Sequence, residues 1–219
     1  MTPRRGHSQT NIFVINDELV AVHTGTMAAN ACSGWDNSEC KGTVHCPPRC
    51  PRFIDNEGTA VVIRPPDSDC RNALLEMYDT IDDSTMGLPP EHRDDREQWL
   101  DRLLNDGWNL IVTADDEVVG HVAVVPADAA DPEFVIFVRP DFQNRKIGTE
   151  LLKHVIAYAD DRDHEELNLN VPKGHRRAIT LYEKIGFSVT DIDRPDLKMR
   201  LPLEAPLVTT VQRPPAGRD

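Results

Sequence analysis

Hydrophobic and polar positions divide the chain after residue 58 into short strand-like and longer helix-like segments. Continuous apolar runs and period-two alternation, both typical of β-strands, occupy 59–64, 109–112, 118–125, 134–138, 167–171 and 197–201. The segments on either side of Asp115-Asp116 are predicted to pair as a hairpin, because only a short polar turn separates them.

Three segments carry apolar residues at helical spacing. The first follows Asp67 or Ser68, either of which can cap a helix, and the second spans 91–104. The third has one apolar face, formed by Ile147, Leu151, Leu152, Val155, Ile156 and Ala159. Because it lies between the strands 134–138 and 167–171, it predicts a right-handed parallel crossover. The whole pattern predicts the α/β (α+β) class, with a mixed central β-sheet flanked by helices.

Residues before 58 follow a different pattern. Two short apolar runs flank Asn16-Asp17-Glu18 and predict a β-hairpin with a tight turn. A polar segment rich in cysteine and proline follows. We therefore expect three parts, which are the hairpin with the Cys-rich segment (1–57), a domain with its own core (58–203) and a flexible tail (204–219).

Four of the five cysteines lie close together, at Cys32, Cys40, Cys46 and Cys50. In a reducing compartment such clustering favours a metal over disulfides, and four thiolates in tetrahedral geometry favour structural zinc. The spacing is not that of a standard zinc knuckle, so unligated or redox-active thiols and disulfides stay as alternatives. The fifth cysteine, Cys70, lies in a predicted helix and is interpreted as a small core residue.

The chain is acidic, with 37 Asp and Glu against 24 Lys and Arg and a net charge of -13. Such a surface repels phosphate backbones, so nucleic acid is not expected as a partner. No apolar run reaches the roughly 18 residues of a membrane span, and the first residues lack the apolar stretch of a secretory signal. We therefore expect a cytoplasmic protein without a membrane partner. The sequence leaves the oligomeric state open.

The segment 134–149 carries the most specific candidate site. An apolar strand, an exit bent by Pro140 and a short polar and basic turn lead into a helix that opens at Gly148. Successive backbone N–H groups and the positive end of the helix dipole then point at one place, where an anion can bind. The residues that would supply this cradle are Gln143, Asn144, Arg145, Lys146, Ile147, Gly148 and Thr149. A diphosphate group is the natural ligand.

Two motifs in order extend this interpretation. They read Val138-x-Pro140-x-Phe142-Gln143-x-x-Lys146-x-Gly148 and His175-x-x-Ala178-x-x-Leu181-Tyr182-x-x-x-Gly186-Phe187. Together they resemble the signatures of the GNAT superfamily of acyl-CoA-dependent N-acetyltransferases, over about 60–201. Lys146 stands where that family usually has its first glycine, and His175 stands where it usually has asparagine.

The resemblance implies an N-acetyltransferase that moves an acetyl or other acyl group from acetyl-CoA to a primary amine of a small molecule or protein. Its partners would be the acyl-CoA and the amine acceptor. In such a fold two parallel strands separate, the pantetheine arm enters the gap, and the diphosphate binds the loop. The cofactor-binding residues that this implies are Ile136, Phe137, Val138, the loop residues 143–149, His175 and Ala178.

Acyl transfer to an amine requires a polarised carbonyl, deprotonation of the amine and protonation of the departing thiolate. Tyr182 is the candidate acid, because the resembled motif places its hydroxyl near the CoA sulfur, although it also falls on an apolar stripe typical of core. Glu133 is the candidate base, with a solvated strand end as its alternative. His121 and deprotonation through water are further alternatives.

A second class of function stays open. The chain could be a non-catalytic acyl-CoA-binding sensor or a zinc-nucleated protein-interaction module. Lys146 and His175 favour this alternative, because both depart from the family pattern. A lysine can still bind phosphate as a point charge, so we prefer the enzyme.

Overall fold

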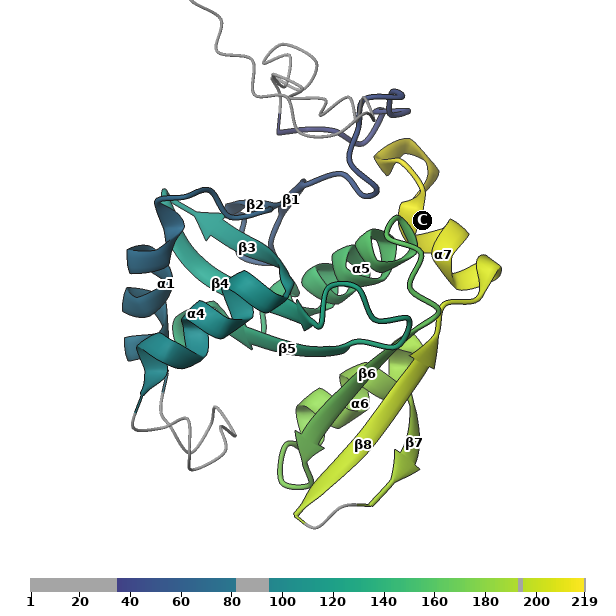
Figure 1. Ribbon diagram of the computed structural model, residues 1–219. Helices are drawn as coiled ribbons and strands as arrows, with labels where there is room; N and C mark the ends of the chain where they lie inside the picture. The colour runs from purple at the N-terminus through teal and green to yellow at the C-terminus, as the bar shows by residue number, and fades with distance from the viewer. Residues whose placement is uncertain (1–34, 82–94, 193–194, 219) are drawn as a thin grey trace, which may run out of the picture. The chain divides into compact units, whose positions relative to one another are not determined.

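The structure, a computed structural model, describes residues 35–81, 95–192 and 195–218 (Figure 1). These residues belong to one compact unit, Gly34–Asp219. The predicted hairpin around Asn16-Asp17-Glu18 and the first cysteine of the predicted zinc site, Cys32, lie outside the described residues. Both sequence motifs lie within them.

Within the described residues the strands form one mixed sheet, in the order β1-β2-β3-β4-β5-β6-β8-β7. The strands are β1 Arg52–Ile54, β2 Ala60–Arg64, β3 Trp108–Ala114, β4 Glu117–Val125, β5 Glu133–Val138, β6 Glu166–Pro172, β7 Ser188–Asp191 and β8 Asp196–Pro202. Strands β3 and β4 form the predicted antiparallel hairpin around Asp115-Asp116, and β5 and β6 form the predicted parallel pair. The mixed sheet predicted from the hydrophobic pattern is confirmed.

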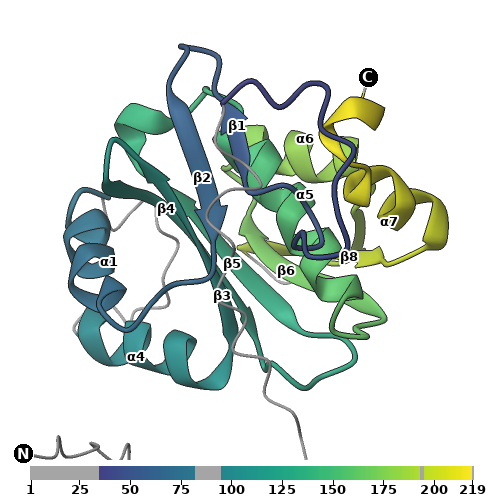
Figure 2. The same cartoon turned by 90° about the horizontal axis from the view of Figure 1, so that it is seen from above.

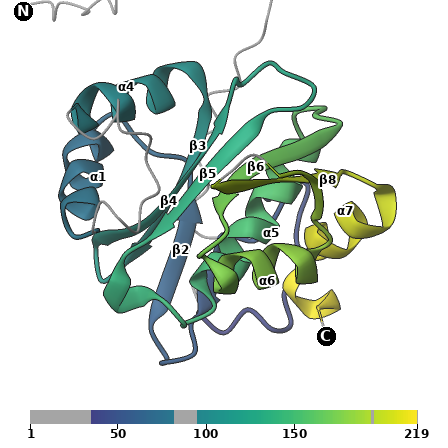
Figure 3. The same ribbon diagram turned by 90° about the horizontal axis from the view of Figure 1, so that it is seen from below.

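Helices cover both faces of this sheet, as Figures 2 and 3 show. Helices α1 (Cys70–Asp79) and α4 (Arg96–Asp106) pack on one face, and α5 (Ile147–Asp160), α6 (Arg176–Ile185) and α7 (Ala205–Gln212) lie on the other. Two short 3-10 helices, η1 (Pro140–Phe142) and η2 (Pro215–Gly217), complete the described elements. Each face has its own buried hydrophobic cluster.

Strand β5 contributes to both clusters through the alternation of its side chains. Phe134 is buried in the cluster beneath α5 and α6, and Ile136 and Val138 pack against the same cluster. Val135 and Phe137 pack against the cluster beneath α1 and α4. The apolar run 134–138 therefore forms a strand with hydrophobic contacts on both faces, as expected for a parallel strand inside a sheet.

The sheet opens between β5 and β6. Strand β5 pairs with β4 along its whole length, from Val125↔Glu133 to Gly120↔Val138, but its register with β6 contains the single pair Glu133↔Asn168. Strand β6 instead pairs with β8 along its whole length. The two parallel strands therefore separate beyond Glu133, toward their C-terminal ends (Figure 1). This gap, which we call the slot, is the separation that the family resemblance implies.

Both ends of the predicted domain differ from the sequence prediction. The predicted flexible tail 204–219 contains α7, whose Val208 and Val211 are buried in the cluster that includes α5. On the N-terminal side β1 pairs with β2, and Arg49, 3% exposed, forms an ion pair of 2.6 Å with Glu150 of α5. Residues on both sides of the predicted 58–203 domain thus complete its packing.

Candidate active site

A cavity of about 1170 Å³ occupies the slot. Its walls come from β5, the loop that leads into α5, β6 and α6, with Trp99 of α4 and Ile81 at the α1 and α4 side. All but two of the predicted catalytic and cofactor-binding residues line it, namely Glu133, Ile136, Phe137, Val138, Gln143, Asn144, Lys146, Gly148, Thr149, His175, Ala178 and Tyr182. The structure therefore gathers residues from both motifs around one space.

The two predicted loop residues that do not line the cavity have structural contacts instead. Arg145 forms ion pairs with Asp55 (3.5 Å) and Glu57 (2.9 Å) in the turn between β1 and β2, and its guanidinium lies 4.5 Å from the centre of the Phe142 ring. Ile147 is 1% exposed and belongs to the hydrophobic core. Their side chains are thus placed away from any ligand in the slot, and only their backbone groups can contribute to the cradle.

The start of α5 has the backbone that an anion cradle requires. Lys146, the residue before the helix, has φ 68°, the left-handed conformation that glycine adopts most easily. The lysine therefore preserves the conformation of the family's first glycine at a cost of about 1–2 kcal/mol. At Gly148 a Cβ atom would come no closer than 4.0 Å to Leu181 and Val138, so this position opens into the slot.

Backbone N–H groups of β5 also point into the slot. The amide of Arg139 donates to Val119 O of β4 (2.9 Å), and Asn168 N of β6 donates to Pro132 O (2.9 Å). Because successive residues of a strand direct their backbone groups to opposite sides, the N–H groups of Ile136 and Val138 point toward β6. Beyond Glu133, where β5 and β6 separate, these two groups face the cavity, whereas the N–H of Phe137 points toward β4.

Tyr182 lies at the α6 wall of the cavity, between core and slot. Its side chain is 7% exposed, and its ring packs against those of Phe134 and Phe187. Burial raises the pKa of the Tyr182 hydroxyl above its usual value, so the group stays protonated at neutral pH. Among the described residues none hydrogen-bonds this hydroxyl. It is therefore a proton donor whose position at the cavity leaves it available to a ligand.

Glu133 lies where β5 and β6 begin to separate, on the opposite face of β5 from Phe134. Its side chain is exposed, and its Oε1 accepts a hydrogen bond of 2.8 Å from Asn170 Nδ2 of β6. Asn170 also lines the cavity. The hydrogen bond joins the two strands of the slot and directs the carboxylate toward the space between them. The sequence analysis did not select Asn170, which alternation alone marks only as an outward-facing strand residue.

His121, an alternative base, is a buried structural residue. It is 0% exposed, and its Nε2 lies 3.0 Å from Asn109 Oδ1, which can only accept. Nε2 therefore carries the proton, and Nδ1 accepts from the Tyr78 hydroxyl at 2.6 Å. Burial lowers the pKa of His121 to about 3. The ring does not line the slot, so the sequence-based alternative of His121 as base is corrected.

The predicted zinc site is not supported by the structure. Cys40, Cys46 and Cys50 are free thiols, and in the described part of the chain no three His, Cys, Asp or Glu side chains are arranged to hold a metal ion. The thiol of Cys46 instead accepts a hydrogen bond of 3.2 Å from Thr43 N. Cys32 lies outside the described residues. The cysteines that are clustered in the sequence are therefore not gathered around one point in the described residues, and the Cys46 thiol bonds a local backbone group instead.

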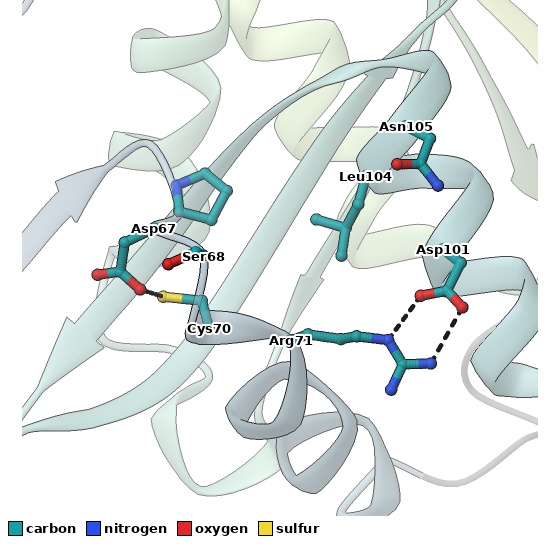
Figure 4. Close-up of a pocket in the computed structure, with 8 residues that line it drawn as sticks. Asp67, Ser68, Cys70, Arg71, Asp101, Leu104 and Asn105 are labelled. Atoms are coloured by element: carbon teal, nitrogen blue, oxygen red, sulfur yellow. Dashed lines mark hydrogen bonds and ion pairs between the residues drawn. The ribbon is translucent and has the colours of Figure 1, made fainter. Parts of the chain in front are cut away.

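A smaller pocket of about 320 Å³ lies between the start of α1 and the end of α4, as Figure 4 shows. The Cys70 thiol donates to Asp67 Oδ1 (2.9 Å), and Arg71 pairs with Asp101 (2.6 Å). Cys70 is 6% exposed within the core, which confirms its interpretation as a core residue. Two pairs of polar groups in this pocket thus bond each other, and the pocket shares no lining residue with the slot.

The open parallel pair, the helix start beside it and the buried tyrosine lie where the two sequence motifs predict them. The model of the acetyltransferase (GNAT) family matches residues 74–187. The chain belongs to this family. None of the helices in the described part of the chain has the length and apolar character that a membrane crossing requires.

Known relatives support the same family. The [ribosomal protein bS18]-alanine N-acetyltransferase of Salmonella typhimurium is 40% identical over 87 residues, which are 39% of this chain and 58% of that protein. The GNAT domain of S. lividans PAT superposes with a TM-score of 0.59 at 17% identity, over 69% of this chain and 95% of that chain. A structure of yncA from Salmonella typhimurium with its cofactor acetyl-CoA superposes with a TM-score of 0.51 at 20% identity, over 66% and 95%. The chain thus spans little more than half of its curated relative, and the structural matches show the fold.

Proposed function

We propose that the protein transfers an acetyl group from acetyl-CoA to a primary amine of a small molecule or protein. The observation that carries this proposal is the slot, in which the two sequence motifs line one cavity between separated parallel strands. Membership of the acetyltransferase family supports the same reaction. The cytoplasmic location stays a prediction from sequence.

The acyl-CoA would bind from the α5 and α6 side. The N-terminus of α5 and the backbone N–H groups of 143–149 would hold the diphosphate, as helix N-termini do for anions. Gly148 opens this wall, and Lys146 adds a positive charge that lines the cavity. His175 and Ala178 would contact the cofactor from the start of α6. The residues present therefore fit a diphosphate in both shape and charge.

The proposed reaction begins at Glu133, where β5 and β6 separate. Glu133, directly or through water, would take a proton from the acceptor ammonium, and the amine nitrogen would form a bond to the thioester carbonyl carbon. The N–H groups of Ile136 and Val138 would stabilise the negative charge that develops on the carbonyl oxygen. When the carbon–sulfur bond breaks, the electron pair remains on sulfur and Tyr182 would donate its proton there. The nitrogen would lose its second proton in the same collapse, and that proton would restore the Tyr182 hydroxyl, directly or through water. The products are an N-acetylated amine and CoA.

The acceptor would approach from the α1 and α4 side of the sheet. That side of the cavity combines the Glu133 carboxylate with the apolar side chains of Ile81, Trp99, Val135 and Phe137. A primary amine attached to an apolar group fits this combination of charge and surface. The Salmonella relative is named for an alanine of a ribosomal protein, so a peptide with an N-terminal alanine belongs among the acceptors to test.

Two measurements test the proposed function. Isothermal titration should show that acetyl-CoA binds, and an amine panel should include a small aliphatic amine, an aromatic ethylamine, a polyamine, a lysine peptide and an alanine peptide. We expect free thiol to appear faster with at least one amine than without any. Binding without thiol release for every amine would favour the non-catalytic acyl-CoA sensor. Absence of acetyl-CoA binding would refute the proposal.

A further inference from the structure

Two arginines at the start of α6 form no ion pair with a carboxylate in the described part of the chain, whereas most of the other described arginines do. Arg176 and Arg177 are exposed and line the slot. Ion pairs hold Arg49, Arg64, Arg71, Arg96, Arg139, Arg145, Arg162, Arg200 and Arg218. Among the described residues no carboxylate pairs with Arg176 or Arg177. In a chain with a net charge of -13, two adjacent arginines without acidic partners are available to a ligand anion.

These arginines lie on the α6 wall of the cavity, and Arg177 reaches the edge of the proposed diphosphate cradle. Arg177 Nη1 donates to Asn144 Oδ1 at 3.3 Å, which places its guanidinium beside the loop before α5 but on the α6 wall. Lys146 also lines the cavity, so three cationic side chains surround this end of it. Two carboxylates also line the cavity, those of Glu133 and Asp196. Asp196 lies opposite Pro172 in the register of β6 and β8. It forms no ion pair with either arginine.

The charge of CoA matches this excess of cations. The molecule carries a diphosphate and, on the same ribose as the adenine, a separate 3′-phosphate. A helix N-terminus and one lysine suit the diphosphate. A phosphomonoester carries about two negative charges near neutral pH, and arginine guanidinium groups bind phosphate oxygens with paired hydrogen bonds. Two neighbouring arginines therefore suit the 3′-phosphate in number and charge.

We propose that Arg176 and Arg177 form a subsite for the 3′-phosphate and make the protein select CoA over dephospho-CoA. The inference rests on the proposed function, since it concerns the same acyl-CoA. It assigns a role to two residues that neither motif marks. The sequence signal is weak, because an Arg-Arg pair at a helix start is also a common solvated feature.

The test compares two ligands that differ only in the 3′-phosphate. Dissociation constants for CoA and dephospho-CoA would be measured by titration calorimetry at one fixed salt concentration, because phosphate contacts depend on salt. The proteins would be the wild type, the double variant Arg176→Gln with Arg177→Gln, and the control Arg71→Gln. Arg71 has the same charge but lies in the smaller pocket between α1 and α4. Thermal melting would confirm that each variant is folded.

We expect the wild type and the control to bind CoA about tenfold more tightly than dephospho-CoA, which corresponds to about 1.4 kcal/mol. The double variant should lose this preference and bind dephospho-CoA as the wild type does. Equal weakening of both ligands would show that the arginines bind the diphosphate and would overturn the inference. A wild type that binds both ligands equally would also overturn it while leaving the proposed function intact. A wild type that binds neither ligand would refute both.

Discussion

The two sides of the slot offer a ligand different chemistry. On the α5 and α6 side the cavity presents backbone N–H groups and the cations Lys146, Arg176 and Arg177. On the α1 and α4 side it presents the carboxylates of Glu133 and Asp196, together with Lys198 and the apolar ring of Trp99. Under the proposed function, a polyanionic cofactor and an amine would therefore bind on different sides of one sheet. Separation of a single pair of strands would then let the two substrates meet.

The largest effect should come from Tyr182, which lies between the two sides. If its hydroxyl protonates the leaving thiolate, Tyr182→Phe should lower kcat about 10²-fold or more, while the acetyl-CoA dissociation constant stays within about twofold. Because burial raises the pKa of this hydroxyl, the wild-type rate should not fall at moderately alkaline pH through its ionisation. Steady-state kinetics and calorimetry check both points. Full activity in the phenylalanine variant would show that Tyr182 is a core packing residue and not the general acid.

The next effect should come from the acceptor side. Removing a general base costs about 10²-fold or more, so Glu133→Gln should lower kcat/KM at neutral pH. Asn170→Asp tests the position of the carboxylate more sharply. A second carboxylate beside Glu133 disfavours its charged form by like-charge repulsion, although Lys198, which is opposite Asn170 on β8, reduces this effect.

The Asn170→Asp enzyme should therefore lose activity at acidic pH sooner than the wild type does, with the acid limb of its kcat/KM profile at higher pH. Asn170→Ala is the matched control, because it removes the hydrogen bond without adding a charge. If the acid limb does not move in either variant and the Glu133→Gln enzyme is active, Glu133 is not the general base. It is then a solvated residue at the end of the strand.

On the cofactor side, Gly148→Glu should weaken acetyl-CoA binding at least tenfold, since the new side chain brings bulk and a like charge to the diphosphate. Gly148→Ala should retain most of the affinity, because its Cβ would have no neighbour closer than 4.0 Å. Calorimetry with both variants separates charge from loss of the glycine. An unchanged dissociation constant in the glutamate variant would move the diphosphate elsewhere.

Much of the cofactor side was predictable from sequence, because a strand, a loop and a helix adjacent in the chain determine it. The continuous apolar run 134–138, the loop 143–149 and Tyr182 lie where the pattern and motifs predict them. The outward direction of Arg145 was not predictable, because it depends on Asp55 and Glu57 about ninety positions earlier.

The acceptor side depends on long-range register, which a single sequence does not reveal. Asn170 meets Glu133 because β6 joins β5 at the single pair Glu133↔Asn168. Helix α7 was also missed. Its Val208 and Val211 are spaced for one helical face, but Pro206, Pro214 and Pro215 in the same segment suggested a tail without a packing partner.

Each face of the sheet also buries a histidine, and this predicts the pH dependence of stability. Burial lowers the pKa of His121 to about 3 and that of His154 to about 4, whereas both rings titrate near 6.5 in the unfolded chain. Below pH of about 6.5 the unfolded state therefore binds more protons than the folded state does. The stabilisation is complete above that pH and is lost as pH falls toward about 3 to 4.

Thermal melting from pH 7 to pH 4 should show a falling Tm. His154→Gln should reduce the slope, because one of the two groups no longer titrates. An identical slope in the variant would show that His154 does not contribute to this dependence.

The smallest effect is expected at Lys146. Its positive φ is strained for a side chain with a Cβ, so Lys146→Gly should raise the free energy of unfolding by up to about 1 kcal/mol. Loss of the cation should at the same time weaken acetyl-CoA binding a few-fold. Chemical denaturation and calorimetry measure the two changes. A variant that is both less stable and unchanged in affinity would contradict this interpretation of the loop.

We propose that acetyl-CoA and an amine meet in the slot between β5 and β6. The most direct measurement follows both products of one reaction, using acetyl-CoA with an isotopically labelled acetyl group and the best amine of the panel. We predict equal amounts of free CoA thiol and of amine carrying the labelled acetyl group, at a rate that falls together for both products in Tyr182→Phe. Thiol release without labelled amine, or equal rates in the wild type and the variant, would contradict the claim.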